Sequence, residues 1–116
     1  MANHLAGHTT FTSRQELDSA VRRHLKGKRH KTNRTDRTVF ELIHSHSGPF
    51  LVAQLTQKQM EDELYVSNST IRRTIRKLIK LEMIRRVAFI EPETQGPGAN
   101  IYVILPAGAW NDVDAD

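Results

Sequence analysis

The chain has 116 residues and no cysteine, carries a formal net charge of +4, and has a sequence pI of about 9.8. This length permits one domain with a modest core, and the lack of cysteine excludes disulfide and thiol chemistry. Neither a secretory signal nor an apolar run long enough to span a bilayer is present, so we expect a soluble cytoplasmic protein. Lys and Arg are confined to the first three quarters of the chain, whereas residues 107–116 form an acidic tail.

The N-terminal part is predicted to contain one helix. Residues 1–12 lack hydrophobic periodicity, and we expect them to be mobile. Ser13 followed by Glu16 predicts a capping box, after which one helical face collects four apolar residues: Leu17, Ala20, Val21 and Leu25. No neighbouring segment offers this face a burial partner, so the helix packs either on the main body or on a second copy of the chain. We predict a homodimer through this helix, with help from Trp110.

A basic stretch follows this helix. The helix and the basic stretch together make up the predicted segment 13–35. Between Lys26 and Arg37 the sequence has six cations, one acid and no apolar residue, which predicts a solvated linker. Such a linker is either a spacer or an arm that follows phosphates. In the second case, the cations of the basic arm are Lys28, Arg29, Lys31 and Arg34.

Residues 36–106 are predicted to form the main domain. Thr35 is expected to cap its first helix, which Gly48-Pro49 terminates. The apolar run Phe50-Leu51-Val52 then predicts a short strand.

A second helix and a hairpin follow. Thr56 with Gln59 forms a capping box for a helix that ends near Leu64. Beyond residue 81, the β-rich runs 87–91 and 100–106 flank a Pro/Gly-rich loop and predict two paired strands.

The helix expected over residues 67–81 has two contrasting faces. At 100° per residue, its apolar side contains Ile71, Ile75, Leu78 and Ile79. The opposite side presents Ser69, Arg73, Arg76 and Lys80, flanked by Arg72 and Lys77, and no acid occurs between Glu63 and Glu82. A solvated face usually mixes both signs of charge, so this stripe favours a surface for phosphates and base edges over simple solvation.

Several of these residues match a known pattern. Val66-Ser67, Thr70-Ile71-Arg72, Ile75, Leu78 and Met83-Ile84 together resemble the signature of GntR-type and related bacterial winged-helix readers. The run Asn100-Ile101-Tyr102 is similar to the wing of helix-turn-helix modules in phage and plasmid replication proteins and their regulators. The resemblance implies a winged helix-turn-helix with an additional N-terminal helix, mainly α with a small β-hairpin (α+β). It also implies sequence-specific binding of double-stranded DNA in transcription regulation or replication control, with helix 67–81 in the major groove.

The resemblance and the charge pattern together define the expected DNA-binding residues. They lie at the start of the penultimate helix and along the cationic helix: Thr56, Gln57, Lys58, Ser67, Asn68, Ser69, Thr70, Arg72, Arg73, Arg76, Lys77 and Lys80. Family members commonly have glycine where this chain has Tyr65 and Glu82, which puts the shape of the turn in question. The predicted wing carries Glu91 and Glu93 and no Lys or Arg, so we expect it to be a secondary contact.

Other functions have weaker support. No catalytic constellation, cofactor motif or small-molecule effector site is evident, so we do not expect an enzyme. His44 and His46 lie two apart on a predicted helix and point in different directions, which argues against a shared metal ion. Two alternatives remain open: a protein-interaction winged helix that docks its cationic helix on an acidic partner, and an RNA-binding module.

Overall fold

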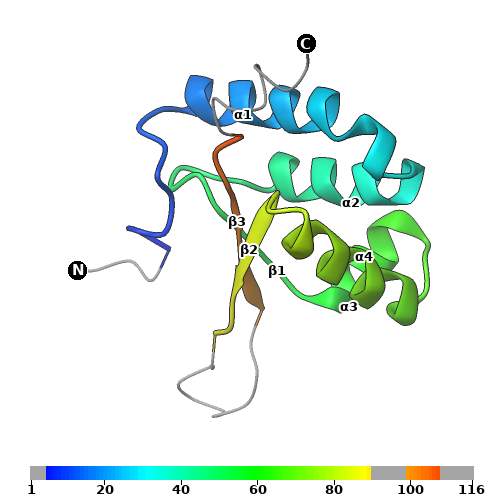
Figure 1. Ribbon diagram of the computed structural model, residues 1–116. Coiled ribbons are helices and arrows are strands. Elements are labelled where there is room, and N and C mark those ends of the chain that lie inside the picture. The colour runs from blue at the N-terminus through cyan, green and yellow to red at the C-terminus, as the bar shows by residue number, and fades with distance from the viewer. Residues whose placement is uncertain (1–4, 90–98, 108–116) are drawn as a thin grey trace.

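A computed structural model describes residues 5–89 and 99–107 of the chain (Figure 1). In sequence order, the elements are helix α1 (Arg14–Gly27), the 3-10 turn η1 (Arg29–Lys31), helix α2 (Arg34–Ser45), strand β1 (Ala53–Leu55), helices α3 (Gln57–Leu64) and α4 (Asn68–Lys80), and strands β2 (Ile84–Val87) and β3 (Asn100–Ile104). The predicted α+β class and the predicted order of helices and strands are confirmed.

Side-chain caps explain where the helices begin. The predicted capping box of α3 is complete, because Thr56 and Gln59 each bind the other's backbone N–H. At α1 only half of the predicted box forms: Ser13 accepts from the Glu16 N–H at 3.1 Å, whereas the Glu16 carboxylate accepts from the Thr12 N–H at 2.8 Å. Both arrangements satisfy N–H groups that a helix start leaves unpaired.

The predicted cap of α2 is wrong. Asn33, not Thr35, caps this helix, in a reciprocal box with Asp36 at 2.8 and 2.9 Å. The reason is the residue three positions later: Asp36 can accept a hydrogen bond from the Asn33 N–H, whereas Thr35 is followed by Thr38, whose hydroxyl binds the carbonyl of Arg34 instead.

The three strands form one antiparallel sheet in the order β1-β3-β2. The predicted strand at residues 50–52 is displaced to β1, because Leu51 has φ +64° and its N–H binds the Gly48 carbonyl at 2.8 Å in a turn. The strand predicted at residues 87–91 is displaced to β2, since Ile84 pairs with Ile104 and Val87 with Ile101. Pairing with β3 therefore sets both strand positions.

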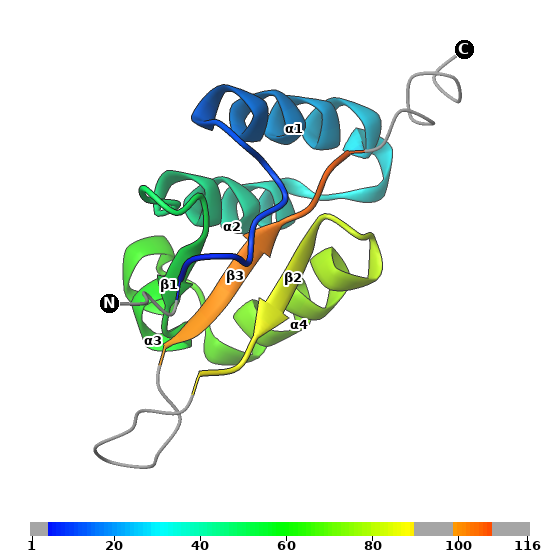
Figure 2. The ribbon, with the colours of Figure 1, turned by 90° about the vertical axis from the view of Figure 1, so that its left-hand side faces the viewer.

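The helices cover one face of the sheet, and the N-terminal segment crosses the other (Figures 1 and 2). The inner face joins the helices in the main core through Ala53, Leu55, Ile84, Tyr102 and Ile104. On the outer face Val52, Ile101 and Val103 are buried, and Leu5 packs against them. Arg85 also reaches this side and donates to the His8 carbonyl at 3.0 Å. Residues 5–12 thus contact the sheet and the main core through Leu5, His8 and Phe11; residues 1–4 lie outside the described parts, and the mobility of residues 1–12 stays a prediction.

Helix α1 belongs to the same core as the rest of the domain. Leu17 is 0% exposed and Val21 3%, and both pack in one cluster with Phe40 of α2. His24 adds a polar tie, since its Nε2 lies 2.7 Å from the Leu105 carbonyl oxygen after β3. The predicted division at residue 36 therefore does not separate two packing units. The apolar stripe predicted to pair two chains is covered within one chain; the homodimer itself stays a prediction, and Trp110 lies outside the described residues.

The basic stretch is folded, which corrects the prediction of a solvated linker. Lys28 is only 8% exposed and Thr32 9%. The Thr32 hydroxyl donates to the Lys28 carbonyl at 2.9 Å, and Arg37 donates to the Thr32 carbonyl at 2.6 Å. These bonds join η1 to the first turns of α2 and hold the cations on a fixed surface. Among the described residues, no helix is both long and apolar enough to cross a membrane.

Candidate nucleic-acid interface

The two faces of α4 are separated as the sequence predicts. Ile71, Thr74, Ile75 and Leu78 are buried, and Ile79 is half-buried. On the other side the exposed residues are Ser69, Arg72, Arg73, Arg76 and Lys80. Burial of one face fixes the rotation of the helix, so the cationic stripe has to face outward.

Four of these cations have no partner in the part of the chain that the structure describes. The side chains of Arg72, Arg73, Arg76 and Lys80 make no hydrogen bond or ion pair with residues 5–89 or 99–107. Lys77 differs, because its Nζ lies 2.5 Å from the nearly buried carboxylate of Asp36 and its charge is already compensated. Of the cations predicted on this helix, Lys77 is therefore the one whose side chain is paired within the fold.

The first turn of α4 is held by hydrogen bonds. The Ser67 Oγ accepts from the Thr70 N–H at 3.2 Å and donates to the Thr70 hydroxyl at 2.9 Å, so Ser67 caps the helix. Ser69 Oγ lies 3.3 Å from the Ser67 Oγ. Asn68 donates to Gln57 at 3.2 Å and to Glu61 at 2.8 Å, which ties the start of α4 to α3. The exposed hydroxyls thus sit on a rigid helix start, where the helix dipole favours an anion.

The three residues predicted at the start of α3 are also in place, each with a contact inside the chain. Thr56 caps the helix, Gln57 accepts from Asn68, and Lys58 pairs with Asp62 at 3.1 Å. The pair raises the pKa of Lys58, so this side chain stays charged. Lys58 and Asp62 are both exposed and can separate at little cost. A phosphate contact by these three residues remains a prediction.

Both positions that differ from the family pattern keep the left-handed backbone that glycine favours. Tyr65 has φ +56° and ψ +43° at the end of α3, and Glu82 has φ +60° just after α4. The turn between the helices is therefore not lengthened. The left-handed backbone costs on the order of 1 kcal/mol at Tyr65 and again at Glu82. The Tyr65 side chain is 93% exposed, so no packing of its ring offsets that strain.

The basic arm meets α4 near the helix's C-terminal half. The ion pair between Lys77 and Asp36 places the start of α2 beside the last turns of α4. Three cations of the arm, Arg29, Lys31 and Arg34, are exposed there or in η1. Lys28 is not available as predicted, because its ammonium is buried 3.3 Å from the His24 Nδ1, and burial lowers the pKa of Lys28.

One exposed cation, Arg86, was not among the predicted DNA-binding residues. Arg86 lies in β2 and pairs with Tyr102 of β3, whose side chain faces the helices. Paired residues of antiparallel strands project from the same face, so Arg86 projects on the α4 side of the sheet. Two adjacent arginines, Arg85 and Arg86, are visible in the sequence. Because the strand was predicted at residues 87–91, neither arginine was assigned to a strand. Glu91 and Glu93 lie outside the described residues.

The histidines near the surface pair with acids. His44 Nε2 is 2.7 Å from Asp18, and His46 Nε2 is 3.1 Å from Glu63. Hydrogen bonding to His44 is the main cause that lowers the pKa of Asp18. Within residues 5–89 and 99–107, no three His, Asp or Glu side chains converge in a metal-binding group.

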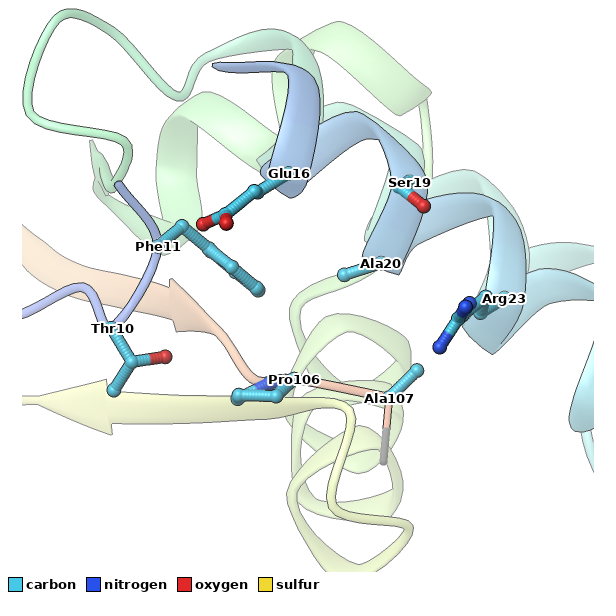
Figure 3. Close-up of a pocket in the computed structure, with 8 residues that line it drawn as sticks. All are labelled: Thr10, Phe11, Glu16, Ser19, Ala20, Arg23, Pro106 and Ala107. Atoms are coloured by element: carbon cyan, nitrogen blue, oxygen red, sulfur yellow. The ribbon is translucent and has the colours of Figure 1, made fainter. Parts of the chain in front are cut away.

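A pocket of about 520 Å³ opens between α1, the N-terminal segment and the chain after β3 (Figure 3). Its lining residues are Thr10, Phe11, Glu16, Ser19, Ala20, Arg23, Pro106 and Ala107. None of them belongs to α3 or α4. The Glu16 carboxylate on its wall already accepts the Thr12 N–H, which lowers the pKa of Glu16.

Comparisons with known proteins show one similarity of fold and give no function. No family model and no curated protein match the chain. A similar solved structure is that of the ST1889 protein from the thermoacidophilic archaeon Sulfolobus tokodaii, with a TM-score of 0.51 and 17% identity over 86% of this chain and 85% of the other. At that identity, the similarity concerns the fold alone.

Proposed function

We propose that the chain is a winged helix-turn-helix protein that binds double-stranded DNA sequence-specifically, with α4 in the major groove, as a transcription regulator or replication-control reader. One observation carries the proposal: four cations on the exposed side of α4 lack any partner among the described residues, while the opposite side of the helix is buried. A major groove accepts one helix, and arginine forks match both phosphates and guanine edges.

The surroundings of α4 support the same proposal. The sheet order β1-β3-β2, in which β2 and β3 are antiparallel neighbours, is the arrangement expected of a wing beside a recognition helix. Asn68 fixes α3 against α4, so the two helices approach a duplex as one unit. Arg29, Lys31 and Arg34 extend the positive surface past the end of α4. Phosphate contacts of this kind position a reader, while α4 supplies the base contacts.

The acids of α3 limit how the duplex can lie. Glu61, Asp62 and Glu63 follow one another at the C-terminal end of α3. Glu61 is held by Asn68, Asp62 by Lys58 and Glu63 by His46, and the end of α3 remains an acidic surface. A duplex therefore approaches the first turn of α3 and the exposed stripe of α4, and avoids the last turn of α3.

Enrichment of bound fragments from the source genome tests the proposal. The protein should retain a small set of duplexes, and an enriched duplex should bind at least tenfold more tightly than a shuffled one in fluorescence anisotropy. Equal binding of both would contradict sequence-specific reading. Preference for RNA of the same sequence would favour the RNA-binding alternative, and a lack of nucleic-acid binding even at low salt would favour an acidic protein partner.

A further inference from the structure

The pocket of Figure 3 has no part in the proposed binding of DNA, because none of its lining residues lies on α3 or α4. Its volume of about 520 Å³ lies within the range of small-molecule sites in proteins. Its walls come from three parts of the chain that are far apart in sequence: residues 10–11, helix α1 and residues 106–107. The pocket therefore exists only in the folded domain and is a candidate site for a ligand of its own.

Hydrogen bonds hold the walls of the pocket in place. The Glu16 carboxylate accepts from the Thr12 N–H at 2.8 Å, which ties the N-terminal segment to α1. On the other side, the Leu105 carbonyl oxygen lies 2.7 Å from the His24 Nε2 of α1. The Leu105 N–H also donates to the Met83 carbonyl at 3.0 Å. These bonds order the walls before a ligand arrives, so binding costs less conformational entropy.

The pocket has opposite charges at its two ends. Glu16 and Arg23 lie seven residues apart on one face of α1, which is about 10 Å along a helix. Figure 3 shows the Glu16 carboxylate at one end of the pocket and the Arg23 guanidinium at the other. The bond from Thr12 lowers the pKa of Glu16, so the carboxylate is ionised at neutral pH. A guanidinium has five N–H donors, so Arg23 can bind an anion in addition to another partner.

The middle of the pocket is apolar. Between the two charged ends lie Phe11, Ala20, Pro106 and Ala107. Ala20 and Ala107 are each 5% exposed, and Phe11 packs against the main core. An apolar group can fill this space without leaving a buried polar group unpaired.

We propose that this pocket binds a small zwitterion of the short-peptide class, with its ammonium group at Glu16, its carboxylate at Arg23 and an apolar body between them. An extended chain advances about 3.3–3.6 Å per residue, so a tripeptide matches the spacing of the two charges. Both charges of such a ligand form ion pairs in the pocket, and charged hydrogen bonds are the stronger ones. The inference does not depend on the proposed function.

The same charges argue against other occupants. A nucleic acid is repelled by the Glu16 carboxylate and has no group to pair with it. Residues 108–116, which follow directly after the pocket wall, contain three aspartates and no Lys or Arg. They can offer a partner to Arg23 but none to Glu16. A ligand with both charges is the one that satisfies both ends.

Isothermal titration calorimetry of the full chain with trileucine tests the site. Trileucine with an acetylated N-terminus and trileucine with an amidated C-terminus should each bind about tenfold more weakly than the free tripeptide, because each lacks one ion pair. Triglycine keeps both charges but lacks the apolar body, so it should also bind more weakly than trileucine.

Two substitutions assign the ends of the ligand. In Glu16→Gln the amide oxygen can still accept from the Thr12 N–H, so the fold is kept, and acetylation of trileucine should no longer change its affinity. In Arg23→Gln, amidation of trileucine should no longer change its affinity. Arg22→Gln is the matched control, because it removes the same charge from the next position of α1, outside the pocket, and should bind trileucine as the wild type does.

Several results would overturn the site. One is a lack of trileucine binding at millimolar concentration, and another is equal affinity for the free and the doubly blocked tripeptide. Equal losses in Arg22→Gln and Arg23→Gln would show that net charge, not the pocket, attracts the ligand. Changes in NMR chemical shift on α4, with none at Phe11, Ala20 or Ala107, would place the ligand elsewhere. None of these results involves DNA, so the proposed function is tested separately.

Discussion

Helices α1 and α4 are both amphipathic, yet their exposed faces differ in a way that bears on function. On α1 the polar residues include both charges, and several of them are paired: Arg14 donates to the Ser47 carbonyl and pairs with Asp18, which also binds His44. On α4 the exposed cations have no acid among them and no partner among the described residues. An amphipathic pattern thus identifies a helix, whereas a single sign of charge without partners indicates a surface kept for a ligand.

The largest expected effect concerns the buried side of α1. Leu17→Ala should lower the free energy of unfolding by about 2–5 kcal/mol, because Leu17 is fully buried in the shared core. Leu25→Ala, at a partly buried position of the same helix, is the matched control and should lower the free energy of unfolding clearly less. Urea denaturation followed by circular dichroism measures both. A small loss for Leu17→Ala would mean that α1 packs elsewhere, for example on a second chain.

The next effect comes from His24, which has no counterpart on α4. Burial is the main cause that lowers the pKa of His24 from 6.5 to about 4. The unfolded chain therefore binds a proton more readily than the folded one. The stabilisation from neutral His24 is complete above pH 6.5 and is lost as the pH falls toward 4.

This loss should amount to no more than about 3 kcal/mol. Urea denaturation of the wild type and of His24→Gln at pH 7, 5.5 and 4 measures it. The wild type should lose more stability over this range than the variant, because the variant lacks the titrating group. Parallel pH profiles would show that His24 is not buried in its neutral form.

Two substitutions on α4 test its exposed face. Arg73→Ala and Arg76→Ala should each weaken binding to an enriched duplex by about 1–3 kcal/mol if they read bases. Arg22→Ala removes the same charge from the exposed face of α1 and should change affinity far less. All three variants should keep the stability of the wild type, since these side chains are exposed. Equal losses of affinity in the three variants would mean that the α4 stripe acts only through the net charge of the protein.

The smallest effect concerns the turn that sets α3 against α4. Tyr65→Gly should raise the free energy of unfolding by up to about 1 kcal/mol, because glycine adopts the left-handed backbone without strain and the exposed ring contributes no packing. Tyr65→Ala keeps the strain and should show no such gain. A loss of stability in Tyr65→Gly would mean that the ring makes a contact in solution. A loss of DNA affinity without a loss of stability would instead place the ring at the duplex.

The sequence predicts the elements whose determinants are local. The pattern of α4 and its cap at Ser67 come from adjacent residues, and so does the capping box at Thr56 and Gln59. The positions of β1 and β2 are not local, because distant pairing with β3 sets them. For the same reason, Arg86 could not be placed beside Tyr102 in advance.

The basic stretch shows a second limit of prediction from the sequence. Its residues are polar, so no hydrophobic pattern signals that they fold. They are ordered by bonds within the segment and by the ion pair of Asp36 with Lys77, a residue far along the chain. Lys28 was therefore expected at phosphates although it is buried, whereas Arg29, Lys31 and Arg34 remain exposed.

The proposed function requires that the cationic side of α4 binds duplex DNA. The most direct measurement is the affinity for an enriched duplex as a function of salt, for the wild type and for a variant with Arg72, Arg73, Arg76 and Lys80 all changed to Gln. We predict a steep linear fall of log affinity with log salt for the wild type. The slope should be smaller by about 3 to 4 for the variant, at about 0.9 for each lost phosphate contact or less where an arginine reads a base. An unchanged slope and affinity in a variant that is still folded would contradict the claim.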